Sequence, residues 1–295
     1  MDVALAVDIG GTKVAAGLVA ADGSLLGRAS APTSGPGVTA EALFDRLAGV
    51  VDEVRSLATV PPVVCGVGCG GPMTPGGEAV SPLNVPAWRG FPLRRRLAEH
   101  TRLVTFVDND AKALALGEGW LGAAAAAGEH NFIAIVVSTG VGGGIVLDGR
   151  LLDGREGNAG HIGHVIVEPG GRRCACGARG CLEAEASGTA IAAVTGRPAA
   201  EAPPEVVRRT GVLVGRAVAS VANLLDLRLA VVAGSVALGF GEPFFLAAQA
   251  ELGRSARLSF STGAVIRPAG LDGTGPLIGA AAVGWRGIGR DLGIR

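Results

Sequence analysis

The side chains with the most evident chemistry gather in the middle of the chain. Residues 158–183 combine two histidines with three of the five cysteines. Thiolates and imidazole are soft ligands, and three thiolates with one imidazole are typical of a closed structural zinc site. The predicted zinc ligands are His164, Cys174, Cys176 and Cys181. The same stretch holds His161 and Glu183, which a structural zinc does not need. It therefore predicts a metal site beside a ligand-binding site.

A disulfide is the competing explanation for these cysteines. It would leave one of the three thiols over, and it should not persist in a reducing compartment. The first residues show no basic segment before an apolar one, and no apolar run has membrane-spanning length. We therefore expect a cytoplasmic protein with no membrane partner, in which metal binding is favoured. Cys65 and Cys69 are expected to be plain buried thiols.

Composition narrows the classes of partner. The chain has 295 residues, 48% of them apolar, which is enough for two domains or one large one with ample core. Its 26 basic and 26 acidic residues balance, so there is no global attraction to nucleic acid or to an anionic membrane. Small neutral or moderately charged ligands remain open. Lysine occurs only at positions 13 and 112, which makes Lys13 more notable.

Two glycine-rich turns are candidates for phosphate binding. Asp8 ends a short apolar strand and is followed by Gly10, Gly11, Thr12 and Lys13. Amides without side-chain cover can cradle phosphate oxygens, and the carboxylate can hold a hydrated magnesium ion. The spacing is not that of a P-loop, and an ordinary hairpin turn is the alternative. The second turn, residues 138–144, favours phosphate binding, because one cradle in each half is what a bound ATP requires.

Asp110 follows a predicted strand at the start of a predicted helix. One interpretation is structural, since Asp108, Asn109 or Asp110 could each cap that helix. The other is catalytic, because a carboxylate at the mouth of a cleft can take the proton from a hydroxyl that attacks phosphorus. The sequence leaves the two interpretations open.

The elements that must position these residues alternate between strand and helix. The expected strands are residues 3–9, 14–19, 63–67, 103–107, 132–137, 145–147 and 229–232. The expected helices are residues 40–57, 93–100, 206–225 and 277–285, with one more beginning at 108–110. Residues 123–128 read as a helix end or a loop. Both halves open with strand, glycine-rich turn and strand, which favours a duplicated α/β architecture with a cleft between two lobes.

The motifs and their order resemble those of the ROK family, which comprises repressors, uncharacterised reading frames and sugar kinases. The resemblance implies an actin-like ATPase fold with duplicated, ribonuclease H-like lobes, a structural zinc site and a homodimer. It places the smaller lobe at residues 1–115, together with a C-terminal helix at about 280–295, and the larger lobe at 116–279. Family repressors carry a DNA-binding extension before the first motif, and since that motif begins at Asp8 we expect none here.

The resemblance also implies roles for individual residues. Asp110 is the expected general base. The expected sugar contacts are Gly71, Asn84, Asn109, Asp110, His161, His164 and Glu183. The expected contacts to ATP and Mg²⁺ are Asp8, Gly10, Gly11, Thr12, Lys13, Thr139, Gly140, Val141, Gly142, Gly234 and Ser235. The implied cofactors are ATP, Mg²⁺ and structural Zn²⁺, and the implied partners are a sugar and ATP, with no nucleic acid.

One position departs from the pattern of most family kinases. They have glutamate where this chain has His161, and the histidine form is similar to that of bacterial N-acetylmannosamine kinases. An imidazole can donate a hydrogen bond, whereas a carboxylate only accepts. The resemblance implies ATP-dependent phosphorylation of the 6-hydroxyl of a hexose or N-acetylhexosamine, and the histidine at position 161 makes N-acetylmannosamine the leading substrate. Glucokinase activity is the alternative, and a non-catalytic sugar sensor is the alternative from another class.

Overall fold

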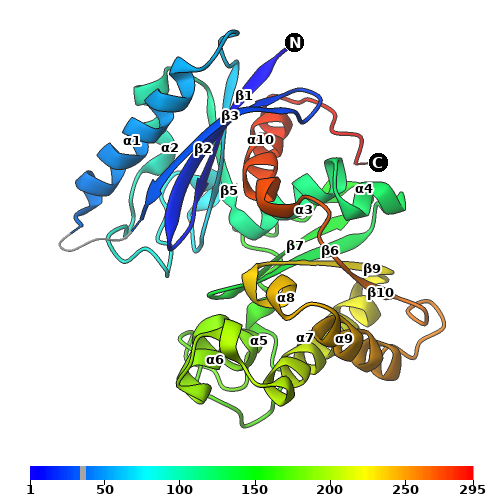
Figure 1. Ribbon diagram of the computed structural model, residues 1–295. Helices are drawn as coiled ribbons and strands as arrows, with labels where there is room; N and C mark the ends of the chain where they lie inside the picture. The colour runs from blue at the N-terminus through cyan, green and yellow to red at the C-terminus, as the bar shows by residue number, and fades with distance from the viewer. Residues whose placement is uncertain (34–37, 295) are drawn as a thin grey trace. The chain divides into compact units, whose positions relative to one another are not determined.

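The computed structural model describes residues 1–33 and 38–294, which form two compact α/β units (Figure 1). Unit 1 comprises residues 1–122, 153–159 and 271–294, and unit 2 comprises residues 123–152 and 160–270. The division lies beyond the expected residue 115, because helix α3 (Asp110–Trp120) runs unbroken past it. The C-terminal helix α10 (Gly275–Gly287) likewise begins before residue 280 and belongs to unit 1. Arg295 lies outside the described residues.

The sheet of unit 1 has the strand order β3-β2-β1-β4-β5. Its strands are β1 (Val3–Ile9), β2 (Lys13–Ala20), β3 (Leu25–Pro32), β4 (Val64–Cys69) and β5 (Thr105–Asn109). β2 pairs antiparallel with β1 and β3, whereas β4 runs parallel to β1 and to β5. The parallel strands bring their carboxyl ends to one edge of the sheet.

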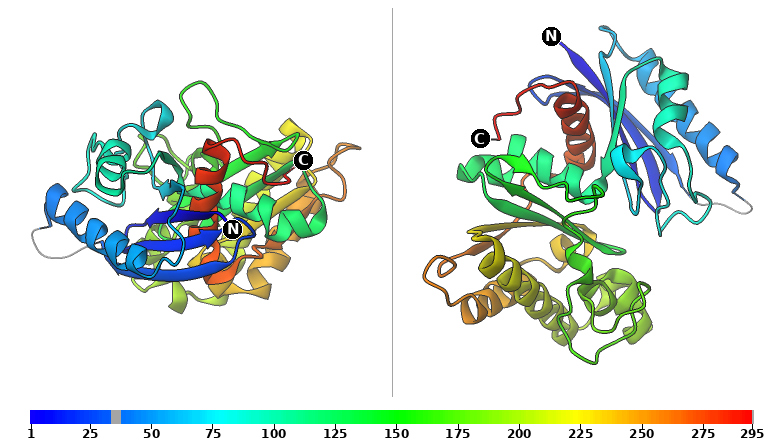
Figure 2. Two further views of the ribbon diagram at one scale, coloured as in Figure 1. Left: turned by 90° about the horizontal axis from the view of Figure 1, so that it is seen from above. Right: turned by 180° about the vertical axis from the view of Figure 1, so that it is seen from behind.

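Helices cover both faces of this sheet (Figures 1 and 2). Leu5, Val7 and Ile9 of β1 pack in the core that includes α1 (Ala40–Ser56) and α2 (Leu93–Thr101). The intervening Ala4 and Ala6 face α10. Because side chains alternate across a strand, large residues fill one face and small ones let α10 approach the other closely.

The sheet of unit 2 repeats the connectivity of the first, with the order β10-β9-β6-β7-β8. Its strands are β6 (Phe132–Val137), β7 (Val141–Leu147), β8 (Arg150–Leu151), β9 (Leu229–Ala233) and β10 (Val265–Pro268). In both units the first three strands form an antiparallel meander, and the last two join parallel to the first. The α/β duplication expected from the sequence is therefore confirmed in strand order.

Helices α7 (Pro204–Leu225) and α9 (Glu242–Ser255) pack with this sheet in one core. The remaining elements are α4 (Ala123–Ala127), α5 (Leu182–Ala186), α6 (Gly188–Thr195), α8 (Ser235–Phe240) and the 3₁₀ turns η1 (Pro75–Gly77), η2 (Ile162–His164), η3 (Ala199–Glu201) and η4 (Asp272–Thr274). Among the described residues, no helix is both long and apolar enough to cross a membrane.

The extent of the second glycine-rich turn was predicted wrongly. Only residues 138–140 turn, because Val141 pairs with Val137 and Gly142 pairs with Val136 in the ladder of β6 and β7. Gly143 continues the strand, and a Cβ there would lie 2.9 Å from the carbonyl oxygen of Gly160. The run of glycines thus serves close packing of a strand. Strands β3 and β10 and helix α9 have no counterpart among the predicted elements.

Close packing of α10 on β4 requires glycine at position 66. A Cβ there would overlap the carbonyl oxygen of Ala280 and lie 2.5 Å from the amide nitrogen of Gly284. We expect Gly66→Ala to lower the free energy of unfolding by about 1–3 kcal/mol, measured by denaturant titration. Gly49→Ala, on the exposed face of α1 with nothing within 4 Å, should raise it by about 0.5–1 kcal/mol. Equal effects of the two substitutions would contradict this account.

Candidate functional site

The polar residues predicted for unit 1 meet at the carboxyl ends of its parallel strands. Asp8 on β1 lies opposite Gly68 on β4, and Gly68 lies opposite Asp108 on β5. Asn109 ends β5, and Asp110 begins α3 directly after it. Ligand-binding groups in α/β sheets collect at this edge, because the loops and helix starts that follow the strands converge there.

Asp8 and Asp110 form a pair of nearby carboxyl groups. A Cβ on Gly68 would lie 3.8 Å from Oδ1 of Asp8 and 3.7 Å from Cα of Asp110, so glycine leaves room for both. Burial and the charge of Asp110 raise the pKa of Asp8 to about 7, although Lys13 opposes this shift. Burial also raises the pKa of Asp110, against a hydrogen bond from the Ala111 amide. Two partly desolvated carboxyl groups side by side favour a shared proton or a bound cation.

The capping role left open by the sequence belongs to Asn109. Its side chain accepts a hydrogen bond from the Ala111 amide at 3.0 Å and caps α3. Oδ1 of Asp110 accepts from the same amide at 2.9 Å, but its other oxygen has no hydrogen-bond partner among the described residues. Oδ1 of Asp108 accepts from the Asn109 amide at 2.8 Å and pairs with Lys112 at 2.9 Å. Oδ2 of Asp108 lies 3.6 Å from the Arg286 guanidinium, so of the three candidates only Asp110 keeps a carboxylate oxygen without a partner among the described residues.

The first glycine-rich turn presents open amides beside this pair. The Gly10 amide donates to the Lys13 carbonyl at 3.0 Å, and the Thr33 hydroxyl donates to the Gly10 carbonyl at 2.7 Å. These bonds hold the turn, while the amides of Gly11 and Thr12 donate to no group among the described residues. Such a pair of amides suits an anionic oxygen.

Asn84 approaches the same turn. A Cβ on Gly11 would lie 2.9 Å from Cβ of Asn84, and one on Gly70 would lie 3.1 Å from its Oδ1. Gly71 follows, and its carbonyl accepts from the Leu83 amide at 3.2 Å. A pocket of about 190 Å³ opens here, lined by Gly11, Thr33, Val38, Leu43, Asn84, Val85, Pro86 and Ala87. The predicted sugar residues Gly71 and Asn84 thus lie next to the predicted phosphate turn in unit 1.

Unit 2 assembles the second set of predicted residues around the turn at 138–140. The hydroxyls of Ser138 and Ser235 lie 2.9 Å apart. Gly234 precedes Ser235 with φ of 101°, pressed against the Val137 carbonyl, where no other residue fits. The amides of Thr139 and Gly140 have no partner among the described residues. This turn and the start of α8 therefore form one polar patch in unit 2.

Glu183 ties this patch to the cysteine-rich stretch. Its Oε2 accepts a hydrogen bond from the Val141 amide at 3.0 Å, and a Cβ on Gly140 would lie 2.8 Å from the same oxygen. The Val141 amide is therefore already satisfied, and Gly142 lies within β7. Among residues 139–142, which were all assigned to ATP, the open amides are those of Thr139 and Gly140.

The four predicted zinc ligands come together in unit 2. One donor atom from each lies within 4.8 Å of all the others. Nδ1 of His164 is 3.7 Å from Sγ of Cys174, and the Sγ atoms of Cys176 and Cys181 are also 3.7 Å apart. Tetrahedral zinc with ordinary bond lengths requires edges of about 3.6 Å for S···N and about 3.8 Å for S···S. These two separations are close to the edges that zinc requires, so the donor set is suited to a metal ion. His161 lies near them, exposed, with its ring centroid 6.1 Å from that of His164.

The model of the ROK family matches residues 4–285. The chain belongs to the ROK family. This confirms the resemblance seen in the motifs, over almost the whole chain.

Several proteins similar to this chain are sugar kinases by name. The N-acetylmannosamine kinase of Escherichia coli O157:H7 is 37% identical over 254 residues, which cover 80% of this chain and 84% of that protein. The glucokinase of Thermotoga maritima is 42% identical over 189 residues, 63% of this chain, but the match spans only 58% of that relative's length. A ROK family glucokinase from Streptomyces griseus, solved with glucose and AMPPNP, superposes with a TM-score of 0.83 at 29% identity, covering 96% of this chain and 99% of that one.

Sequence reasoning missed one polar network of this ROK protein. The ammonium group of the buried Lys112 lies 2.9 Å from Asp108 and 2.8 Å from Asp153, and Arg286 pairs with Asp153 at 2.8 Å. Through Asp153, these ion pairs attach the segment Asp153–Ala159 to α3 and α10. Lys112 lies two residues after Asp110 on α3. The chain has lysine only at positions 13 and 112, which could have pointed to Lys112, but only Lys13 was singled out from the sequence. Cys65 and Cys69 are buried, as predicted.

The raised pKa of Asp8 predicts a particular dependence of stability on pH. An acid whose pKa is higher in the folded state binds more protons there, so stability falls as pH rises from about 4 to about 7. Asp8→Asn removes this loss of stability. We expect the free energy of unfolding of the variant to exceed that of wild type by up to a few kcal/mol at pH 7.5 and to differ little from it at pH 4. Denaturant titrations at both pH values, without divalent cations, measure the difference. A gain of equal size at both values would contradict the assignment.

Proposed function

We propose that this ROK protein is an ATP-dependent kinase for the 6-hydroxyl of a hexose or N-acetylhexosamine, with N-acetylmannosamine as the preferred substrate. The observation that carries the proposal is the pair of Asp8 and Asp110 at the ends of parallel strands, beside a turn with open amides. Phosphoryl transfer needs such parts, because it depends on positioning and on charge neutralisation more than on covalent chemistry.

The repeated strand order of the two units supports an actin-like ATPase fold with ribonuclease H-like halves. In this assignment Gly10, Gly11, Thr12 and Lys13 bind phosphate oxygens from unit 1. Thr139, Gly140, Gly234 and Ser235 bind the nucleotide from unit 2. Asp8 holds the magnesium ion, which when bound supplies neutralising charge to the phosphates. The partial positive charge of open amides and of Lys13 acts in the same direction.

Asp110 acts as the general base. Its uncapped oxygen accepts the proton of the sugar 6-hydroxyl as that oxygen attacks the terminal phosphorus of ATP. Burial raises the pKa of Asp110 and so makes its carboxylate a better proton acceptor than an exposed one. Asn109, fixed by its hydrogen bond to the Ala111 amide, presents its remaining amide hydrogens to the sugar.

The cysteine-rich stretch holds a structural zinc ion. His164 and the three cysteines are its ligands, and four protein ligands leave no open coordination position for catalysis. A metal ion bound by Nδ1 would fix the ring of His164, and Nε2 would then offer the sugar a rigid hydrogen-bond donor. Glu183, in the same unit, is the accepting partner for the sugar. By resemblance to the family, the protein forms a homodimer.

His161 is the proposed selector of the sugar. Its imidazole can donate to the acetamide oxygen at C2, or accommodate the different stereochemistry of a mannose ring, where a glutamate only accepts. The greater coverage of the N-acetylmannosamine kinases supports this substrate. Glucokinase activity is the second candidate, favoured by the higher local identity to the Thermotoga maritima protein.

The base assignment predicts the effect of Asp110→Asn. The amide cannot accept the proton, so we expect kcat to fall by at least about 100-fold while KM for the sugar changes by less than about threefold. Steady-state kinetics with a coupled ADP assay measure both, and a thermal melt checks that the variant is folded. Turnover within tenfold of wild type would refute the role of Asp110.

The selector assignment predicts a change in preference between sugars. The same assay over a panel of N-acetylmannosamine, N-acetylglucosamine, glucose and mannose should give the highest kcat/KM for N-acetylmannosamine. His161→Glu should shift the ratio of kcat/KM for N-acetylmannosamine to that for glucose at least about tenfold towards glucose. An unchanged ratio would eliminate His161 as selector, and no turnover with any of these sugars would favour a non-catalytic sensor.

A further inference from the structure

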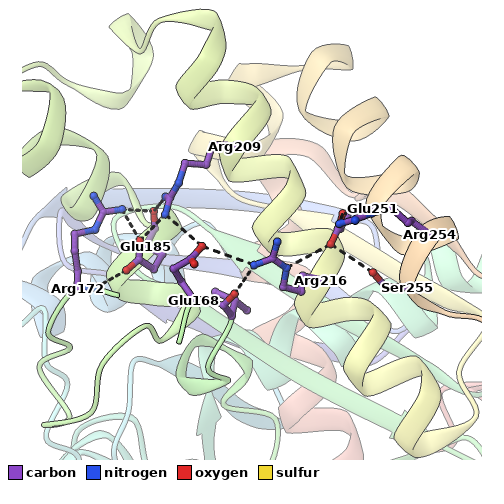
Figure 3. A network of polar contacts seen from close by, with 9 residues as sticks. Glu168, Arg172, Glu185, Arg209, Arg216, Glu251, Arg254 and Ser255 are labelled. Atoms are coloured by element: carbon purple, nitrogen blue, oxygen red, sulfur yellow. Dashed lines mark hydrogen bonds and ion pairs between the residues drawn. The ribbon is translucent and has the colours of Figure 1, made fainter. Parts of the chain in front are cut away.

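A chain of arginine–carboxylate contacts runs across unit 2 from Arg172 to Arg254, beside the loop that carries the cysteines (Figure 3). We call residues 165–182 the metal loop. Its stem is closed by the hydrogen bond from the Leu182 amide to the Val165 carbonyl at 2.9 Å and by the pairing of Ile166 with Cys181. His164 stands just before this stem and Glu183 just after it. The two predicted sugar contacts of this stretch therefore depend on how the stem is held.

Glu185, two residues after Glu183 on α5, is the centre of the contacts on one side. Its carboxylate accepts from the Arg172 amide at 2.6 Å, from the Arg172 guanidinium at 2.9 Å and from the Arg209 guanidinium at 2.8 Å. Arg172 also donates to the carbonyls of Ala184 and Glu185 at 3.0 and 2.9 Å. The side chain of Glu185 is only 2% exposed. Arg172 thus joins the interior of the metal loop to α5 without involving any metal ligand.

Helix α7 contributes two arginines to the contacts that hold the loop. Arg209 and Arg216 are seven residues apart and therefore lie on the same face of the helix. Arg209 reaches Glu185, and Arg216 donates to the Val167 carbonyl at 2.6 Å and lies 3.7 Å from Glu168. Helix α7 thereby contacts the first arm of the stem at Val167 and helix α5, which follows the second arm, at Glu185.

The chain of contacts continues beyond the loop and ends in a second buried glutamate. Glu251 on α9 is 5% exposed and contacts Arg216 at 3.3 Å and Arg254. It matches Glu185 in burial and in having two arginine partners, but it lies on the side of α7 away from the loop (Figure 3). Hydrogen bonds from their arginine partners hold the pKa of each glutamate below its ordinary value, although burial alone would raise it.

We propose that Glu185 is a positioning residue for sugar binding: gripped by Arg172 and Arg209, it fixes α5 so that Glu183 bonds to the Val141 amide, and it closes the metal loop independently of zinc. The loop is then fastened twice. A metal ion would join Cys174 and Cys176 inside the loop to His164 and Cys181 at its stem, and charge-assisted hydrogen bonds, which are the stronger kind, hold Arg172 and α5 together through Glu185. The effect on sugar affinity rests on the proposed kinase function, whereas the effect on the loop does not.

The test compares Glu185→Gln with Glu251→Gln in the zinc-loaded protein. Each substitution removes one buried charge with two arginine partners, so both should lower the melting temperature. Only Glu185→Gln should raise KM for the sugar, by about fivefold or more with kcat within twofold, because a displaced Glu183 weakens binding without touching the base. Only Glu185→Gln should also speed zinc transfer to a chromophoric chelator and tryptic cleavage after the exposed Arg173 and Arg179, each by about fivefold or more.

Equal changes in KM, zinc release and cleavage for the two variants would overturn the proposal, since Glu185 would then contribute to stability alone. If Glu185→Gln does not fold, Glu185→Asp replaces it, because aspartate keeps the charge but is shorter by one methylene. The same comparison of KM, zinc release and cleavage is then made with Glu251→Asp. If the wild-type protein phosphorylates no sugar, the kinase proposal fails. Zinc release and tryptic cleavage then decide the role of Glu185 by themselves.

Discussion

The pairing of two carboxyl groups, Asp8 and Asp110, is the constraint on which the rest of unit 1 depends. They come from strand ends a hundred residues apart, and the burial that raises their pKa values makes the pair unfavourable without a proton or a cation. Neither carboxyl group is needed to hold the local structure, because neighbouring groups make the stabilising contacts there. Asn109 caps α3, and Lys112 neutralises Asp108. Asp110 is left with an oxygen that the fold does not use.

Unit 2 must hold polar loops in place on an apolar core formed by its sheet with α7 and α9. The turn at 138–140 is fastened through Ser138 to the start of α8, and Glu183 fastens the metal loop to β7 through Val141. In our proposal two sets of contacts order the metal loop, the four metal donors and the ion pairs of Arg172 and Arg209 with Glu185. Soft ligands and charge-assisted hydrogen bonds respond to different conditions, so loss of one does not remove the other.

Much of the fold could be predicted from apolar periodicity, and the failures have physical causes. The strand at 132–137 was predicted with its observed bounds, and the helix at 40–57 to within one residue, because each has a strong apolar pattern. Strand β3 alternates half-buried and exposed residues with few large apolar side chains, so its pattern is weak. Residues 141–144 looked like a turn because glycine usually breaks strands, whereas here it allows two backbone segments to approach.

The sequence by itself determined the donor set of the metal site, the first glycine-rich turn, the alternation of elements and membership of the ROK family. Each is a local property, set by residue types at short spacing. Only the tertiary structure decided that Asn109 is the cap, that Glu183 occupies the Val141 amide and that Glu185 lies between Arg172 and Arg209. These outcomes depend on strand register and on which side chains burial brings together across long stretches of chain, and no local pattern encodes those distances.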